Sequence, residues 1–237
     1  MVNEFWPGGP KFIKDAAFPI GTDAVMLYDF ALKCSGSKIC DLGCGSGVIG
    51  IMLALKNPRA HVLGVELQKS SAEIARENAA LNGISDRFSV TEGDMRSFKG
   101  LLPAGEFDLT VSNPPYFPEN SGRAAKKQSL AFARSEETCT LLDVCSAAAY
   151  ITRWGGRFAL VHKPERMAEA IYTMHSCGLE PKRLRLVCHR PGGEPNLVLI
   201  EGRRGGKPGL TVEAPMYLTD ASGGDTPEVK RIYHREN

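Results

Sequence analysis

The stretch Lys38-Ile39-Cys40-Asp41-Leu42-Gly43-Cys44-Gly45-Ser46-Gly47 decides the fold, because a short apolar run passes directly into a glycine-rich turn. An uninterrupted apolar segment, residues 48–55, follows the turn and stops before Asn57-Pro58. The pattern predicts a strand over 38–42, a turn over 43–47 and a helix over 48–55. A strand with hardly any polar residue is typical of a parallel sheet that helices cover on both faces.

The same alternation continues on both sides of this unit. Helices are expected from Thr22 or Asp23 to Gly36, from Ser70 or Ser71 to Leu81, from about Glu137 to Thr152, and from Pro164 to near Gly178. Strands are expected over 61–66, 88–91, 107–113 and 157–162, followed by a pair over 182–189 and 196–200. The fold class is therefore α/β, a Rossmann-like doubly wound, mostly parallel seven-stranded sheet with an antiparallel C-terminal strand pair.

We expect residues 1–237 to form a single domain. It has an irregular or short-stranded N-terminal segment (1–21), a core (22–201) and an irregular tail (202–237), with at most one short strand near Leu218.

Composition excludes several classes of protein. The chain has 24% charged residues and a net charge of +2, which is too small to indicate nucleic-acid binding without local clusters. It contains no apolar run long enough to cross a membrane, and its first residues do not resemble a signal peptide, so a cytoplasmic protein is expected. Its seven cysteines contain no Cys-x-x-Cys pair and are expected to be reduced, without a metal. A monomer is the default expectation.

Polar side chains follow four of the predicted strands at the point where each strand ends. These residues are Asp41, Glu66, Asp94 and Asn113. Because the carboxyl ends of parallel strands meet at one edge of a sheet, the four are expected to line a ligand site there.

Two kinds of ligand are compatible with this part of the sequence. Gly45-Ser46-Gly47-Val48-Ile49-Gly50 fits the Gly-x-Gly-x-x-Gly pattern of dinucleotide sites, so an NAD-dependent dehydrogenase is a competing hypothesis. However, carboxylates at Asp41 and Asp94 would repel a pyrophosphate. A cluster of acids suits a cationic ligand that carries a ribose.

The segment Asn113-Pro114-Pro115-Tyr116 ends the fourth strand in a stiff, extended turn, because proline fixes φ and restricts the residue before it. These residues resemble the catalytic loop of amino-group methyltransferases, which implies as acceptor an exocyclic amine such as that of adenine, a poor nucleophile because its lone pair is delocalised. If the side-chain oxygen of Asn113 and the carbonyl of Pro114 accept its two N–H bonds, the nitrogen can pyramidalise. Tyr116 offers a face on which a base can stack.

Residues 41–47 resemble the glycine-rich loop of class I S-adenosylmethionine-dependent methyltransferases. The resemblance implies S-adenosylmethionine as cofactor, with Glu66 on the ribose, Asp94 and Met95 at the adenine, and Asp41 near the methionine end. The cofactor-binding set that it implies is Asp41, Leu42, Gly43, Cys44, Gly45, Glu66, Leu67, Asp94, Met95 and Asn113. Residues 113–116 resemble the catalytic loop of the amino-group methyltransferases, which implies catalytic roles for Asn113, Pro114, Pro115 and Tyr116.

From about residue 12 to 201 the chain resembles the bacterial tRNA adenine-N6 methyltransferases that modify position 37 of a valine tRNA. It departs from their usual pattern at Arg134-Ser135-Glu136 and at Asp225-Thr226-Pro227-Glu228. A glutamine amide has the same two N–H groups, so a protein glutamine, a DNA adenine or an rRNA base remains an alternative substrate. About twenty residues precede the first predicted helix, unlike in the glutamine methyltransferases, which carry a helical N-terminal domain.

Basic residues follow the catalytic motif, and their position favours RNA binding by Tyr116, Arg123, Lys126, Lys127 and Arg134. The cluster Lys182-Arg183-Leu184-Arg185 is interpreted as solvated surface, and residues 203–207 add positive charge. Cys44 and both tryptophans, Trp6 and Trp154, are expected to serve packing, and His162 to be a structural or rim residue.

Overall fold

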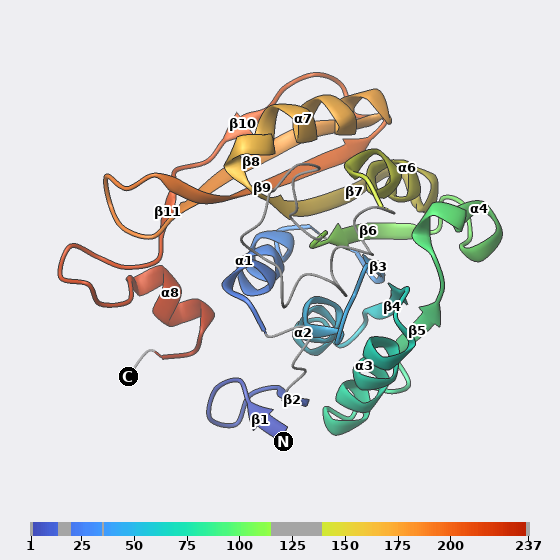
Figure 1. The fold of residues 1–237 in the computed structure, drawn as a ribbon, viewed down its shortest axis with the longest axis horizontal. Helices are drawn as coiled ribbons and strands as arrows, with labels where there is room; N and C mark the ends of the chain where they lie inside the picture. The colour runs from blue at the N-terminus through green and yellow to red at the C-terminus, as the bar shows by residue number, and fades with distance from the viewer. Residues whose placement is uncertain (1, 14–19, 35, 115–138, 236–237) are drawn as a thin grey trace, which may run out of the picture.

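The protein has the predicted α/β architecture, with a twisted sheet between two layers of helices (Figure 1). The structure is a computed structural model that describes residues 2–13, 20–34, 36–114 and 139–235. Within these ranges, no helix has the length and apolar character that crossing a bilayer requires. The predicted loop 117–135, together with Pro115, Tyr116, Arg123, Lys126, Lys127 and Arg134, lies outside the described residues.

The prediction of a mostly parallel sheet is confirmed. Its seven long strands are β3 (Lys38–Leu42), β4 (His61–Glu66), β5 (Phe88–Glu92), β6 (Phe107–Ser112), β7 (Thr152–His162), β8 (Leu179–Cys188) and β9 (Pro195–Arg204). They lie in the order β8-β9-β7-β6-β3-β4-β5. Neighbours from β5 to β7 are parallel, whereas β9 is antiparallel to both β7 and β8. Two short strands, β10 (Thr211–Val212) and β11 (Met216–Tyr217), add to β8 in parallel.

Helices cover both faces because the strands are apolar on both. One face packs against α1 (Thr22–Ala31), α2 (Val48–Lys56) and α3 (Lys69–Leu81), and the other against α4 (Phe98–Leu101), α6 (Leu141–Ile151) and α7 (Met167–Ser176). Two short 3₁₀ turns, η1 (Met95–Ser97) and η2 (Pro164–Arg166), precede α4 and α7. Along β3, Ile39 belongs to the first core while Cys40 and Leu42 belong to the second, which is the period of two expected for a strand.

Several predicted boundaries shift because a capping group or a backbone turn fixes them. Helix α6 begins at Leu141, later than predicted, because Thr140 has an extended backbone and forms a capping box with Asp143. Helix α1 begins at Thr22 with Gly21, rather than Thr22 or Asp23, as its N-cap residue. Strand β7 begins at Thr152 rather than 157.

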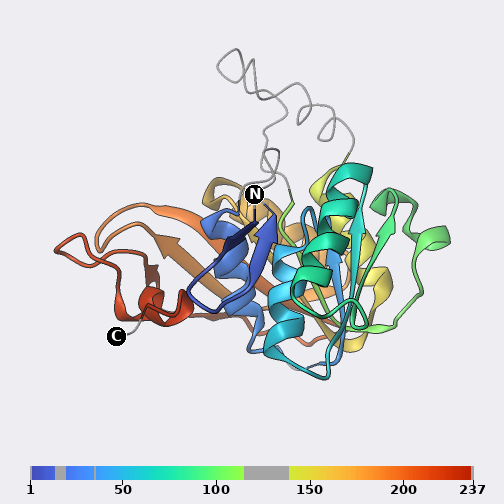
Figure 2. The ribbon, with the colours of Figure 1, turned by 90° about the horizontal axis from the view of Figure 1, so that it is seen from below.

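The short strand predicted near Leu218 corresponds to β11, but the rest of the tail is more ordered than the irregular segment that was predicted. Besides β10 and β11 it contains a helix, α8 (Pro227–Ile232), that Thr226 caps. Glu228 of α8 forms an ion pair with Arg185 of β8 at 2.7 Å, and Arg231 forms one with Asp29 of α1 at 2.9 Å. Figure 2 shows this red tail beside the orange β8–β9 hairpin, on the opposite side of the molecule from α3 and β5.

The N-terminal segment forms a two-stranded antiparallel sheet from β1 (Val2–Glu4) and β2 (Lys11–Ile13), as the short-stranded alternative predicted. Asn78 of α3 accepts the backbone N–H of Ile13 at 2.7 Å, and Asn82, the C-cap residue of that helix, accepts the N–H of Lys11 at 2.9 Å. The Phe5 ring stacks on Tyr233 after α8 with ring centroids 5.6 Å apart, so the two ends of the described chain pack together.

Candidate functional site

Strand register brings the predicted site residues to one edge of the sheet. Leu42 of β3 pairs with Val65 of β4 and with Ser112 of β6, and Glu66 pairs with Glu92 of β5. All four strands are parallel, so the residues that follow these positions lie at the same carboxyl edge. The expectation that Asp41, Glu66, Asp94 and Asn113 come from neighbouring strand ends is therefore confirmed.

Asp41 is a buried carboxylate with one unused oxygen. Its Oδ2 accepts the backbone N–H of Gly50 in α2 at 3.0 Å. Its Oδ1 is the one buried side-chain oxygen or nitrogen in the described ranges that has no hydrogen-bond partner. Burial raises the pKa of Asp41 to about 7, with Glu66 as a smaller contribution in the same direction. A buried acceptor of this kind suits a donor or a cation that arrives with a ligand.

Glu66 shapes the glycine-rich loop as well as the site. Its Oε2 accepts the N–H of Gly45 and its Oε1 accepts the N–H of Gln68, each at 2.8 Å. The loop is held from the other side by Val65, whose carbonyl accepts the N–H groups of Gly43 and Cys44. Because each carboxylate oxygen can accept more than one hydrogen bond, Glu66 is held in place and can still accept from a ligand hydroxyl.

Tight packing explains the residue types within the loop. Gly47 has φ of 83°, and a Cβ there would lie 3.0 Å from both Ile51 and Phe88, so a larger residue is excluded on two grounds. Cys44 is buried, and its sulfur fills the space over Gly64. Cys44 belongs to the first core, as its predicted packing role requires, and burial holds the pKa of its thiol well above the usual value.

The adjoining segment after β5 approaches the same loop. The N–H of Gly93 donates to the carbonyl of Glu66 at 2.9 Å, and a Cβ on Gly43 would lie 3.4 Å from the methyl group of Met95. Leu67, next to Glu66, exposes 52% of its surface. Exposed apolar side chains at a polar site suit the face of a flat ring.

Asp94 differs from the simple expectation of a carboxylate directed at a ligand. It is the N-cap residue of η1 and accepts from the backbone N–H of Arg96 at 2.9 Å. The Arg96 side chain also donates to both carboxylate oxygens of Asp94, and its two bonds to Oδ2 are 2.8 and 2.5 Å long. This ion pair lowers the pKa of Asp94. Nothing in the sequence indicated that Arg96 forms an ion pair with Asp94 at the edge of the site.

Asn113 and Pro114 follow β6 directly, and Pro114 is buried. The residue before them, Ser112, is fully buried, and its hydroxyl donates to the carbonyl of Leu42 at 2.8 Å. This bond ties the start of the Asn-Pro-Pro-Tyr segment to the residue that precedes the glycine-rich loop. Sequence analysis missed Ser112, because a serine within a buried strand carries no signal of its own.

His162 ends β7 at the same edge and is 1% exposed. Its Nδ1 accepts the N–H of Lys163 at 2.8 Å. Burial, together with Arg166, lowers the pKa of His162 to about 4, so the imidazole is neutral near pH 7. The expectation of a structural role rather than a general base agrees with this environment.

The basic cluster 182–185 is not the solvated surface that the sequence suggested. Arg183 is paired with Glu201 at 2.5 Å and with Glu213 at 2.9 Å, while Arg185 is paired with Glu228. Glu201 is 1% exposed and also contacts Arg157. These arginines therefore hold the tail and a buried acid in place.

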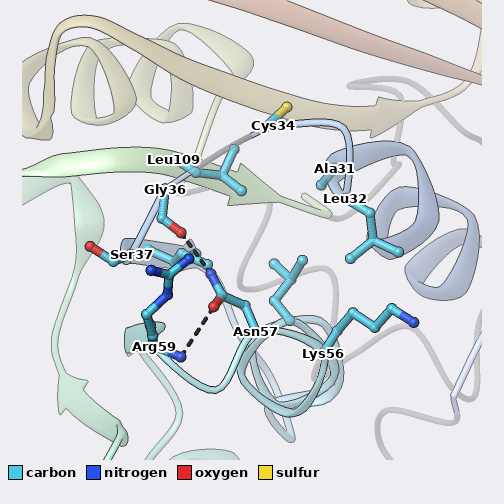
Figure 3. Close-up of a pocket in the computed structure, with 11 residues that line it drawn as sticks. Ala31, Leu32, Cys34, Gly36, Ser37, Lys56, Asn57, Arg59 and Leu109 are labelled. Atoms are coloured by element: carbon cyan, nitrogen blue, oxygen red, sulfur yellow. Dashed lines mark hydrogen bonds between the residues drawn. The ribbon is translucent and has the colours of Figure 1, made fainter.

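A separate cavity of about 730 Å³ opens at the opposite end of the sheet (Figure 3). Its lining includes Ser37 and Leu109, near the amino ends of β3 and β6, and the exposed side chains of Lys56 and Arg59. It contains none of the predicted site residues and is distinct from the edge at Asn113. Across the described part of the chain, no three His, Cys, Asp or Glu side chains gather as a metal site would require.

The comparisons with known proteins agree with this geometry. The family model described as "Methyltransferase small domain" matches residues 18–138. A relative from Porphyromonas gingivalis, named tRNA1(Val) (adenine(37)-N6)-methyltransferase, is 35% identical over 193 residues, which cover 79% of this chain and 75% of the relative.

Two solved structures extend the comparison. A predicted O-methyltransferase from Agrobacterium tumefaciens is 25% identical, with a TM-score of 0.72 over 90% of this chain and 96% of that chain. A geranyl diphosphate C-methyltransferase from Streptomyces coelicolor, solved with S-adenosyl-L-homocysteine, Mg²⁺ and geranyl diphosphate, shares the fold. It is 16% identical, with a TM-score of 0.57 over 76% of this chain and 77% of that chain.

Proposed function

From the premise that this chain belongs to the methyltransferase small-domain family, we propose that it methylates the N6 amino group of adenine 37 in a valine tRNA. The methyl donor is S-adenosylmethionine. The observation that carries the substrate assignment is the 35% identity, over most of both chains, to a relative named for this reaction. The dehydrogenase alternative has no support among the relatives, which are named as methyltransferases.

The carboxyl edge of the sheet fits this cofactor. Asp41 has a buried oxygen without a partner, which suits the positive charge of the methionine part. Glu66 has a carboxylate held between two N–H donors, and we assign it to the ribose hydroxyls. We assign the turn residues Leu42, Gly43, Cys44 and Gly45 to the cofactor as well. We assign to its adenine the residues Leu67, Asp94 and Met95. When bound, the cofactor supplies an electrophilic methyl group.

The chain's own residues then hold the acceptor amine. We assign the Asn113 side-chain oxygen and the Pro114 carbonyl as acceptors of the two N–H bonds of adenine N6. Accepting both aligns the nitrogen lone pair with the methyl group, and the prolines keep the acceptors fixed. The bond from Ser112 to Leu42 supports this assignment, since it fixes the start of the segment beside the loop that holds the cofactor.

No strong base is required, because the methylated nitrogen is acidic enough to lose its proton to water. Burial lowers the pKa of His162 to about 4, which makes it a weak base and agrees with a mechanism that needs no strong one. We assign Tyr116 to stacking on the target base, at ~1–3 kcal/mol per base, and Arg123, Lys126, Lys127 and Arg134 to the RNA backbone. We also propose that the enzyme works in the cytoplasm, as a monomer and without a metal.

The proposal is tested by mass spectrometry of purified tRNA from cells with and without the gene. Loss of N6-methyladenosine from one valine tRNA, restored by the wild-type gene and not by an Asn113→Ala gene, is expected. If the tRNA is unchanged and a methylated glutamine in a protein is lost, the substrate is a protein glutamine amide and not an adenine.

A further inference from the structure

Strand β7 contains a bulge that the proposed reaction does not use. Phe107 of β6 pairs with Thr152, but Leu109 pairs with Arg157, so two steps along β6 correspond to five along β7. The three extra residues form a bulge within β7, and Trp154 lies in this segment. Trp154 exposes 75% of its surface, the largest fraction among the exposed large hydrophobic residues of the described ranges. The expectation that it is a packing anchor was wrong.

The indole ring of Trp154 packs against a specific position of the chain. It lies against Gly205, where a Cβ would overlap the ring, so the loop after β9 accepts the ring only with glycine at this position. The N–H of Gly205 donates to the carbonyl of Gly178 at 3.1 Å, which fixes that loop on the start of β8. One part of the ring is therefore held while the rest faces solvent.

Basic residues lie in the segments that adjoin this ring, and we call the five residues Arg153, Trp154, Lys182, Arg203 and Lys207 the Trp154 patch. Arg203 donates to the carbonyl of Gly155 at 3.2 Å, and Lys182 donates to the carbonyl of Lys207 at 2.9 Å. These contacts orient the cations without neutralising them.

Two acids lie near the patch, and one of them pairs with a residue of the patch, Arg153. Asp108 accepts from Arg153 at 2.6 Å and from the N–H groups of Ser37 and Lys38. Glu180 contacts His175 at 2.6 Å. The patch therefore combines an exposed aromatic ring with a local excess of positive charge, whereas the whole chain is nearly neutral at +2.

An aromatic ring flanked by Arg and Lys is the arrangement by which proteins stack an unpaired base and bind the phosphates beside it. In the sheet, Arg157 pairs with Leu109 and Leu160 pairs with Ser112, the residue before Asn113. Since a strand rises about 3.3 Å per residue, the patch lies on the order of 15 Å from Asn113 along β7. One base cannot occupy both places.

We propose that the Trp154 patch is a second RNA-binding surface, which holds an unpaired base and its phosphates on a part of the substrate RNA other than the methylated adenine. The inference rests on the proposed function, since it takes structured RNA as the substrate. The charge of the patch favours RNA over a protein partner.

The chain offers a direct spectroscopic test, because it contains two tryptophans. In a Trp6→Phe variant, Trp154 is the single tryptophan, and titration with valine tRNA transcript is expected to quench its fluorescence. The matched control is Trp154→Phe, which leaves Trp6, whose ring stacks on His234 with centroids 4.3 Å apart. RNA is expected to leave the fluorescence of that variant unchanged.

Binding measurements give the second readout. Trp154→Ala is expected to raise the Kd for the transcript by about 5-fold or more, the lower bound for one base stacked on an aromatic ring. Trp154→Phe should retain most of the affinity. Tyr172→Ala, which removes another aromatic side chain that is 73% exposed, should leave Kd unchanged. Arg203→Gln should reduce the slope of log K against log salt by about 0.7–0.9.

The failure of this inference differs from the failure of the proposed function. A wild-type enzyme that methylates the transcript, with Kd and KM unchanged in Trp154→Ala and no quenching in Trp6→Phe, overturns the second RNA surface alone. Wild-type protein that binds S-adenosylmethionine and neither binds nor methylates the transcript overturns both.

Discussion

Replacing Asp41 by asparagine is expected to stabilise the cofactor-free protein at neutral and alkaline pH. Asparagine keeps an oxygen for the N–H of Gly50, which Asp41 now accepts at 3.0 Å, and removes the buried charge. Its NH2 group replaces the unpaired Oδ1, and the cost of burying that donor offsets part of the gain. With a pKa of about 7 in the folded protein against 3.8 for the free side chain, the ionised carboxylate opposes folding by roughly 4 kcal/mol above pH 7, at about 1.4 kcal/mol per pH unit.

The sign follows from proton binding. Between about pH 4 and pH 7 the unfolded chain has lost the Asp41 proton while the folded chain keeps it, so the stability that this group contributes is full below pH 4 and is lost as the pH rises through 7. Urea unfolding of wild type and Asp41→Asn from pH 4 to pH 8 should give a stability difference that grows with pH. It should level off above pH 7 at about 2–4 kcal/mol in favour of the variant.

Asp108→Asn is the matched control, because its pKa shift has the opposite sign. Burial raises the pKa of Asp108, but the N–H groups of Lys38 and Ser37 and the Arg153 side chain outweigh it and lower the pKa overall. This variant should be less stable than wild type at pH 7, with a deficit that disappears as the pH falls below 4. An Asp41→Asn variant that is less stable than wild type at pH 8, or equally shifted at every pH, would refute the reasoning about Asp41.

Three further predictions concern the site and its support. Asn113→Ala should lower kcat on tRNA about 100-fold or more while calorimetry gives an unchanged Kd for S-adenosylmethionine, because the lost acceptor acts on the amine; normal turnover would refute the proposed role. Glu66→Ala should raise that Kd at least about 10-fold in the same titration, since it removes a charged acceptor and frees the N–H of Gly45; an unchanged Kd would remove Glu66 from the cofactor site. Arg183→Ala should lower the free energy of unfolding in urea by about 3 kcal/mol, because buried Glu201 loses one of its two arginines. A loss of RNA affinity at unchanged stability would instead make Arg183 an RNA contact.

The central unit could be predicted from the sequence because its determinants are local. The apolar run 38–42, the glycines and the helix over 48–56 follow one another directly, and the acids mark where strands end. Parallel neighbours then bring Asp41, Glu66 and Asn113 to one edge by geometry alone. The same reasoning places Asp94 at this edge but gives no sign of its ion pair with Arg96, two residues later.

The regions that differ from expectation depend on contacts between distant segments. Helix α8 has six residues and is held by burial of Val229 and Ile232 and by ion pairs with Arg185 and Asp29, which lie far away in the sequence. Trp154 is exposed in a bulge of β7, where the register against β6 shifts. Neither the partner of an arginine nor a shift in strand register can be read from the residues on either side.

The most direct test of the proposed function is methylation of an unmodified valine tRNA transcript by the purified protein with S-adenosylmethionine, followed by nuclease digestion and mass spectrometry of the fragments. The proposal predicts one added methyl group, on N6 of adenine 37, and none with Asn113→Ala. A methyl group at another position, or unmodified RNA from a protein that binds the cofactor, would contradict it.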